Sequence, residues 1–209
     1  MTRILMLLLA FTALPLGASA ADATDDPARL VRNTAEYVLG QVRARKAELE
    51  RNTAGIYELV EKEVVPHFDF RRMVRSAVGR YWRRASEAQK QRLADEFREL
   101  LVRSYATMLL GYSDEQIEYL PFHARPGDRR VVVRTRVRTR DGAPPVPIDY
   151  RLYRNRNGEW KVYDVVVDGV SLVANYRASF ANEIRKGGIE GLIRSLAEHN
   201  RKLRSGRRG

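Results

Sequence analysis

The feature that most constrains the fold of this 209-residue chain is a change of hydrophobic period after Gly111. Before that residue, apolar side chains recur at the three- and four-residue spacing of amphipathic helices. After it they alternate with polar side chains, which is the period of half-buried strands. Further helical spacing follows. Helices, then antiparallel strands, then helices predict an α+β fold with helices on one face of the sheet. We expect a helical N-terminal half, about four strands and two C-terminal helices.

Capping residues mark the starts of the expected helices. Asp26 stands before a proline at a first helical position, and Asp69 can cap a short helix that Gly79 ends. Ser86 and Gln89 form a capping box before the longest apolar stripe of the chain. The predicted helices start near residues 27, 55, 70 and 87, and two more cover 172–186 and 189–203.

Alternation of side chains predicts the strands. The segment Arg130 to Thr139 alternates valine or threonine with arginine, so one face is apolar and the other is charged. The flanking segment VPIDYRLYR repeats this pattern and brings Asp149 to the charged face. The predicted strands cover 116–122, 130–139, 146–154 and 159–167, and a hairpin at 155–158 joins the last two. The charged residues of the second strand, called the arginine ladder below, are Arg134, Arg136, Arg138 and Arg140.

The arginine ladder poses a choice between a nucleic-acid platform and a solvated sheet face. A platform for single-stranded nucleic acid interleaves aromatic side chains with basic ones for base stacking. The charged face of this strand has no aromatic residue. We therefore interpret the ladder as a solvated face or as a docking surface for an acidic partner through Arg134, Arg136 and Arg138, and we expect no nucleic acid.

The first twenty residues predict a cleavable secretory signal peptide. Arg3 precedes an apolar run, and Ala18-Ser19-Ala20 supplies the small residues of a cleavage site. The run is shorter than the roughly 20 residues that a membrane span requires. We expect an exported soluble protein with a single domain over residues 21–204 and a basic tail at 205–209.

Composition narrows the function classes. The chain has no cysteine, so disulfides, thiolate catalysis and a lipid-modified cysteine are excluded. An exported domain without disulfides depends on its core for stability, as periplasmic proteins do. Removal of the signal lowers the formal net charge from +12 to about +11, which favours an anionic partner. Export makes an acidic protein or an anionic lipid a better candidate than nucleic acid.

Residues able to carry chemistry are few. His67, His123 and His199 lack the short spacing of zinc ligands, and no GxxxxGK[ST] phosphate-binding loop occurs. We expect no metal and no ATPase activity. Ser171 lies between a strand and a helix, as a hydrolase nucleophile does, but Val173 occupies the place of the second glycine of G-x-S-x-G. A turn at Asp168-Gly169 followed by a Ser171 helix cap is the favoured interpretation. An exported esterase or lipase that uses Ser171 stays open as an alternative.

The segment WKVYDVVVDGVSLVANYRASF, residues 160–180, resembles the signature of the MlaC family of periplasmic phospholipid-binding proteins, also called toluene-tolerance proteins. The resemblance extends over nearly all of the mature chain, with an arginine-rich sheet and a basic tail as minor departures. The matching residues of the segment are Trp160, Val162, Asp164, Val165, Gly169, Ser171, Leu172, Tyr176, Arg177 and Phe180. Further matches are His67 to Phe70, Gly79, Trp82, Phe97, Tyr105 and Tyr112.

The resemblance implies a fold related to the NTF2-like arrangement, with acyl chains held in a cavity between helices and sheet. It implies a shuttle that carries phospholipid between the MlaA–porin complex of the outer membrane and an inner-membrane ABC transporter with an MCE-domain subunit. Such a shuttle maintains outer-membrane lipid asymmetry. Phospholipid would be cargo, no cofactor would be needed, and contact with membranes would be transient. An adaptor that docks on an acidic partner without carrying lipid is a further alternative.

Lipid transport through water requires a dry apolar site, because each exposed CH₂ costs about 0.8 kcal/mol. The wide apolar stripe of the helices and the apolar sheet face can supply one if the two layers stand apart. Ser171, at a helix start, is also placed to meet a lipid phosphate. The candidate lining residues from helices are Phe70, Met73, Val74, Phe97, Leu101, Tyr105, Met108, Leu172, Tyr176 and Phe180. Those from the sheet and its last turn are Val133, Val137, Ile148, Tyr150, Leu152, Val162, Val166, Gly169 and Ser171.

Overall fold

The computed structural model describes residues 26–111, 115–125, 127–138 and 142–206. The predicted signal peptide, most of the predicted tail, and Thr139 and Arg140 at the end of the ladder strand lie outside these residues. The helical elements are α1 (Pro27–Ala44), α2 (Lys46–Arg51), α3 (Ala54–Glu63), η1 (Val65–His67), α4 (Phe70–Val78), η2 (Gly79–Arg84), α5 (Glu87–Tyr105), α6 (Met108–Gly111) and α7 (Leu172–Arg204). The strands are β1 (Gln116–Tyr119), β2 (Arg130–Arg138), β3 (Val146–Arg154), β4 (Trp160–Val167) and β5 (Val170–Ser171).

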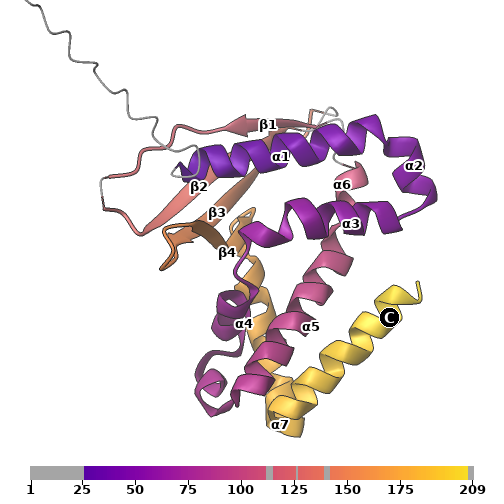
Figure 1. Cartoon of the computed structure of the whole chain (residues 1–209), viewed down its shortest axis with the longest axis vertical. Coiled ribbons are helices and arrows are strands. Elements are labelled where there is room, and N and C mark those ends of the chain that lie inside the picture. Colours follow the sequence, from indigo (N-terminus) through magenta and orange to yellow (C-terminus); the bar gives the residue numbers. More distant parts are fainter. Residues whose placement is uncertain (1–25, 112–114, 126, 139–141, 207–209) are drawn as a thin grey trace, which may run out of the picture.

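The predicted α+β fold class is confirmed. The described strands form one antiparallel sheet in the order β1-β2-β3-β4-β5. Helix α1 runs across the sheet, whereas α5 and the two limbs of α7 extend away from it (Figure 1). The sequence predicted about four strands; the fifth, β5, is a two-residue strand that follows the turn after β4. Helix α2 was not predicted.

Local capping explains where the helices begin. Asp26 accepts a hydrogen bond from the Ala28 N–H at 2.8 Å, and Asp69 accepts one from the Arg72 N–H at 2.8 Å. Both parts of the Ser86 capping box are present. These side chains satisfy N–H groups that have no partner inside the helix, as the sequence predicted.

The predicted boundaries differ from the structure at two places. The long helix was expected to continue through Met108, but α5 ends at Tyr105 and α6 begins separately. The first strand ends at Tyr119 rather than at residue 122. The two predicted C-terminal helices are present as the two limbs of α7, which meet at a kink where Gly188 adopts φ 67° and ψ −170°. Only glycine populates that backbone region readily.

The buried apolar residues form separate clusters. The largest joins α4, η2, α5 and α7, and includes Met73, Phe97 and Phe180. A second joins α1, α2, α3 and the end of α5. A third lies between α1 and the sheet, with Val133 and Leu152 at its centre. The half-buried Phe68, between η1 and α4, packs against both the first and the third cluster and so links the helical layer to the sheet.

The arginine ladder strand is two-sided, as predicted. Alternate residues of β2 are buried, from Val131 to Val137, while Arg134, Arg136 and Arg138 are exposed. Arg134 lies 3.8 Å from the Asp149 carboxylate, and Arg138 forms a 2.8 Å ion pair with Glu118. The charged face is therefore solvated and partly neutralised by its neighbours in the sheet.

Candidate lipid-binding site

Most of the predicted helix-side residues lie together in the α4–α5–α7 cluster. Met73, Val74 and Phe97 are completely buried there. The Phe97 ring contacts the rings of Tyr176 and Phe180 edge-on, with centroids 5.2 Å and 5.5 Å apart. The members of the predicted set that belong to this cluster or pack against it are Phe70, Met73, Val74, Phe97, Leu101, Leu172, Tyr176 and Phe180.

Two predicted residues lie outside this cluster, at the end of the α5 stripe. Tyr105 is 39% exposed and Met108 is 49% exposed. Burial raises the pKa of the Tyr176 phenol, and a hydrogen bond with Tyr105 raises it further. Tyr105 of α5 and Tyr176 of α7 therefore lie near each other, and the apolar stripe reaches the surface at this end.

The predicted sheet-side residues belong to a different cluster. Val133, Leu152 and Val162 pack with Val31 of α1, and Tyr150 packs against them. Burial raises the pKa of the Tyr150 phenol. Val137 is buried and Ile148 is half-buried, and both lie on the same face. The structure thus places the helix-side and sheet-side candidates in two clusters that Phe68 links.

The expected position of Val166 is wrong. The register between β3 and β4 shifts between Arg151 and Leu152, so that Leu152 pairs with Val162 but Asp149 pairs with Val166. This β-bulge reverses the alternation of β4 and turns Val166 to the face of Asp149. Val165, opposite Tyr150, takes its place on the face of Val133. The extra residue could not be recognised from the alternation of side chains along β4.

Ser171 is a helix cap in the structure. Its hydroxyl accepts the Ala174 N–H at 3.0 Å and donates to the buried Asp164 carboxylate at 2.7 Å. Asp164 also accepts the Val173 N–H at 3.2 Å and a hydrogen bond from Arg151 at 3.1 Å. The predicted turn is present, with positive φ at both residues that precede Val170.

A nucleophilic serine would require a neighbouring base, and histidine is the usual one. The three histidines lie in η1, in the segment between β1 and β2, and in the second limb of α7. Ser171 hydrogen-bonds to a carboxylate and to a backbone N–H instead. Within the described ranges, no group of three His, Asp or Glu residues could hold a metal ion. The geometry supports the cap rather than the esterase alternative.

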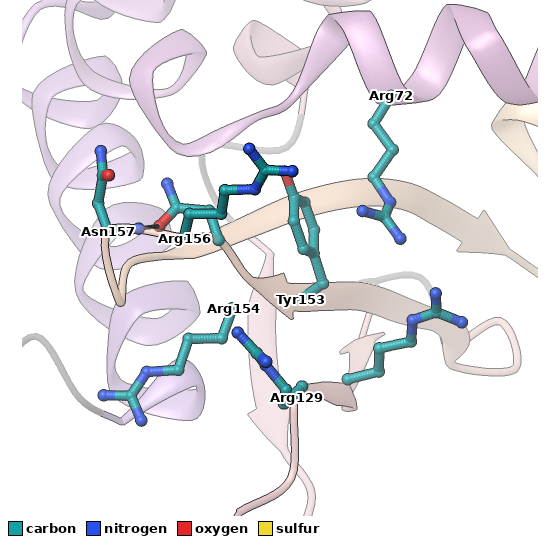
Figure 2. A pocket seen from close by; sticks show the side chains of 8 residues that line it. Arg72, Arg129, Tyr153, Arg154, Arg156 and Asn157 are labelled. Atoms are coloured by element: carbon teal, nitrogen blue, oxygen red, sulfur yellow. Dashed lines mark hydrogen bonds between the residues drawn. The ribbon is translucent and has the colours of Figure 1, made fainter.

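The sequence did not predict a basic pocket at one end of the sheet. This concave site of about 610 Å³ lies where β2 begins and the β3–β4 hairpin turns. Arginines surround Tyr153 in it, with Arg72 reaching down from α4 and Arg129, Arg154 and Arg156 coming from the sheet end (Figure 2). Asn155, Asn157 and Arg130 complete the lining. These residues come from three distant parts of the sequence, which is why no local motif indicated them.

The fold and the apolar clusters define the class: an α+β protein whose antiparallel sheet and helical layer match those of a phospholipid-binding protein. The chain superimposes on a solved structure of such a protein from Ralstonia solanacearum in complex with a phospholipid, with a TM-score of 0.77 and 36% identity, covering 86% of this chain and 99% of that one. The family described as MlaC protein matches residues 32–198. The chain belongs to the MlaC family.

Two curated relatives extend the similarity. The intermembrane phospholipid transport system binding protein MlaC of Haemophilus influenzae is 24% identical over 180 residues, which cover 85% of this chain and 84% of that protein. The toluene tolerance protein ttg2D of Pseudomonas putida is 31% identical over 183 residues, 87% of this chain and 82% of that protein. Among the described residues, no helix is both long and apolar enough to cross a membrane.

Proposed function

We propose that this protein is a periplasmic phospholipid carrier and not an enzyme. The observation that carries the proposal is the match to a solved structure that contains a phospholipid, which covers 86% of this chain and 99% of that one. The relatives with curated names are a phospholipid transport binding protein and a toluene tolerance protein, and neither name describes an enzyme. The Ser171 geometry agrees with this, because the hydroxyl is engaged in capping α7.

The acyl chains are proposed to lie between the helical layer and the helix-facing side of the sheet. Half-buried apolar side chains occur on both sides, including Leu172 and Tyr176 on α7 and Ile148 and Tyr150 on β3. Each methylene that moves from water into such a site contributes about 0.8 kcal/mol. Entry is proposed at the exposed end of the α5 stripe, beside Tyr105.

The lipid headgroup is proposed to remain in solvent rather than on Ser171. The first N–H groups of α7 are already engaged, since Val173 donates to Asp164 and Ala174 donates to Ser171. The Asp164 carboxylate would also repel a phosphate at this position. Gly169 and Ser171 would then border the acyl site through the turn that leads into Leu172.

The transport route is proposed to run between the MlaA–porin complex of the outer membrane and the MCE-domain subunit of an inner-membrane ABC transporter. The carrier has no phosphate-binding loop of its own, so direction must come from the transporter or from a difference in lipid affinity between donor and acceptor. Arg136 is the ladder residue best placed to dock an acidic partner, because Arg134 and Arg138 already have carboxylate partners.

Mass spectrometry of the protein purified without detergent tests the proposal. We expect about one phospholipid per protein, and exchange of that lipid with vesicles. Preparations that contain no lipid and take up none from vesicles would overturn the carrier function. Hydrolysis of short-chain esters that disappears in a Ser171→Ala variant would instead support the esterase alternative.

A further inference from the structure

The basic pocket lies on the sheet face opposite to the proposed acyl site. Arg130 pairs with Tyr153 across β2 and β3, and their neighbours in the chain, Val131 and Leu152, pair on the other face. Successive side chains of a strand point to opposite faces. None of the candidate acyl-lining residues lines the pocket. The pocket therefore differs from the proposed cargo site in its lining residues, and the two are connected through α4, which carries Arg72 as well as Phe70 and Met73.

The pocket is built on a firm backbone framework. The Asn155 side-chain oxygen accepts the N–H groups of Asn157 and Glu159, each at 2.9 Å, and fixes the hairpin turn. The Arg154 N–H bonds to the Arg129 carbonyl at 3.0 Å, which ties the start of β2 to the end of β3. The Arg154 side chain donates to the Gly158 carbonyl at 2.8 Å. These bonds hold the arginines of two chain segments around one hollow.

Arg72 is oriented by an aromatic ring and a carboxylate. Its guanidinium lies 3.9 Å from the centroid of the Tyr153 ring and 5.2 Å from that of Tyr163. The Tyr153 hydroxyl donates to Asp69, and Asp69 also accepts the Arg72 N–H. Arg72 therefore covers one face of the Tyr153 ring.

The pocket has an excess of positive charge. Its lining includes arginines 72, 129, 130, 154 and 156 and no acidic residue. In the described part of the chain, no carboxylate forms an ion pair with Arg129, Arg130 or Arg156. Two carboxylates contact lining residues without pairing with these three arginines: Asp69 accepts a hydrogen bond from Tyr153, and Glu159 accepts one from Asn155 and pairs with Lys161. Like charges gathered around one hollow repel one another unless an anion occupies it.

We propose that this pocket is a binding site for a phosphate group, either free or on a lipid headgroup. Guanidinium groups form paired hydrogen bonds to phosphate oxygens, and arginine is the preferred residue for such recognition. Arginines that approach from α4, from the start of β2 and from the hairpin can surround a tetrahedral anion, whose oxygens point in several directions, more fully than a planar carboxylate. The hollow is large enough for a phosphate and a small attached polar group.

Titration calorimetry of the mature protein tests this site with two phosphate probes, and with an acidic glutamate peptide for comparison. The first is inorganic pyrophosphate in solution; the second is a phosphatidylcholine vesicle with and without phosphatidylglycerol. Saturable binding of pyrophosphate would identify a soluble phosphate site. Binding only to vesicles that contain phosphatidylglycerol would identify a headgroup site. Binding to neither, or tighter binding of an acidic glutamate peptide than of either phosphate probe, would overturn the proposal.

Two variants that lose the same number of charges distinguish a specific binding site from unspecific electrostatic attraction. Arg129→Gln with Arg156→Gln removes two charges from the pocket, and Arg134→Gln with Arg136→Gln removes two from the ladder on the same sheet face. We expect the pocket variant to bind at least about tenfold more weakly, because it loses two guanidinium groups that would contact the phosphate, and the ladder variant to change less than about threefold. Equal losses in both variants would overturn the proposal. Copurifying lipid should be unchanged in both, which separates this result from any failure of the carrier function.

Discussion

At the scale of single residues, Asp164 connects the sheet to α7. Its buried carboxylate accepts hydrogen bonds from Ser171, from the Val173 N–H and from Arg151, so three parts of the chain meet on one side chain. Arg151 itself is 44% exposed, so this is a partly solvated pair and not a fully buried one. Such pairs stabilise less by charge than by hydrogen bonds that leave no buried group unpaired.

Replacement of Ser171 should cost stability without abolishing lipid binding. Ser171→Ala removes the cap of α7 and one donor to Asp164, so the free energy of unfolding should fall by about 1–2 kcal/mol. Urea denaturation measures the change. The matched control is Ser179→Ala, an exposed position on the same helix, which should change stability by less than about 0.5 kcal/mol. Loss of copurified lipid in Ser171→Ala alone would show that the serine holds the cargo.

Tyr119 should make stability fall in alkaline solution. Burial raises the pKa of its phenol to about 12, and the nearby Glu36 carboxylate and Tyr150 add to the shift. Below pH 10 the phenol is protonated in both folded and unfolded chains, so its contribution to stability is fully present. Between pH 10 and about 12 the unfolded chain loses this proton first, and that contribution is lost as pH rises.

The comparison of wild type with Tyr119→Phe checks this pH dependence. Denaturant unfolding at several values from about pH 9 to pH 12 should show a steeper loss of stability in the wild type than in the variant. The Tyr119 hydroxyl has no hydrogen-bond partner among the described residues, so the variant should also be as stable as wild type at neutral pH. Parallel curves for the two proteins would contradict the prediction.

At the scale of elements, α7 depends on one glycine. The helix covers the α4–α5 cluster with its first limb and returns along α5 with its second, as Figure 1 shows. The change of direction occurs at Gly188, and the preceding Gly187 has no such backbone requirement. Asn200 on the second limb donates to the Glu96 backbone carbonyl at 3.0 Å and so fixes this limb against α5.

Alanine at the two glycines should have opposite effects. Gly188→Ala forces a Cβ into a backbone region that side chains rarely adopt, and it should lower the free energy of unfolding by about 1–3 kcal/mol. Gly187→Ala should raise it by about 0.5–1 kcal/mol, because alanine loses less chain entropy in a helix. Neither added Cβ would meet another atom within 4 Å. The difference in free energy of unfolding between the two variants therefore reports the cost of the backbone conformation at residue 188. Urea denaturation of the two variants measures it, and a loss of equal size in both would contradict this account.

At the scale of the whole molecule, the two faces of the sheet have different chemistry. One faces α1 and carries the apolar residues of the proposed acyl site, and the other carries the arginine ladder and the basic pocket. A carrier built this way can keep its cargo on one side and present charge to membranes or partners on the other.

A larger side chain on the helix-facing side of the sheet should therefore lower the amount of bound lipid, and a larger side chain on the opposite face should not. Ile148→Trp places a large side chain on the helix-facing side, where Ile148 is half-buried, and should displace several methylenes of an acyl chain. At about 0.8 kcal/mol for each methylene, lipid affinity should fall more than about tenfold. Val132→Trp, on the opposite face and also half-buried, is the control. Mass spectrometry of both purified variants measures retained lipid; equal retention would place the cargo elsewhere.

Much of this fold could be predicted from local sequence because its signals are local. The caps Asp26, Asp69, Ser86 and Ser171 act within three residues of themselves, and each was found where predicted. The alternation of β2 was equally clear because one face of the strand is buried.

The remaining features depend on pairing between distant segments. The bulge opposite Arg151 is a property of two strands together, so the reversal that moves Val166 could not be read from β4 alone. The basic pocket brings Arg129 and Arg156 together with Arg72, which lies more than fifty residues before them in the chain, so the pocket forms only in the folded protein. The apolar stripe of the helices and the apolar face of the sheet could likewise be predicted, but the distance between them could not.

The short pairing of Phe68 and Asp69 with β4 has a consequence for how molecules of this protein meet. Phe68 bridges to Val162, the Asp69 N–H donates to the Val162 carbonyl at 2.9 Å, and β5 covers the other half of the same edge. An uncovered edge strand is a template on which a second chain can add, and this is a route to amyloid-like growth. Under the proposed cycle, each delivery of cargo leaves an empty carrier with apolar surface uncovered. With this edge of β4 already paired at Val162, Val166 and Val167, a collision between two empty carriers finds little free backbone there on which to extend the sheet.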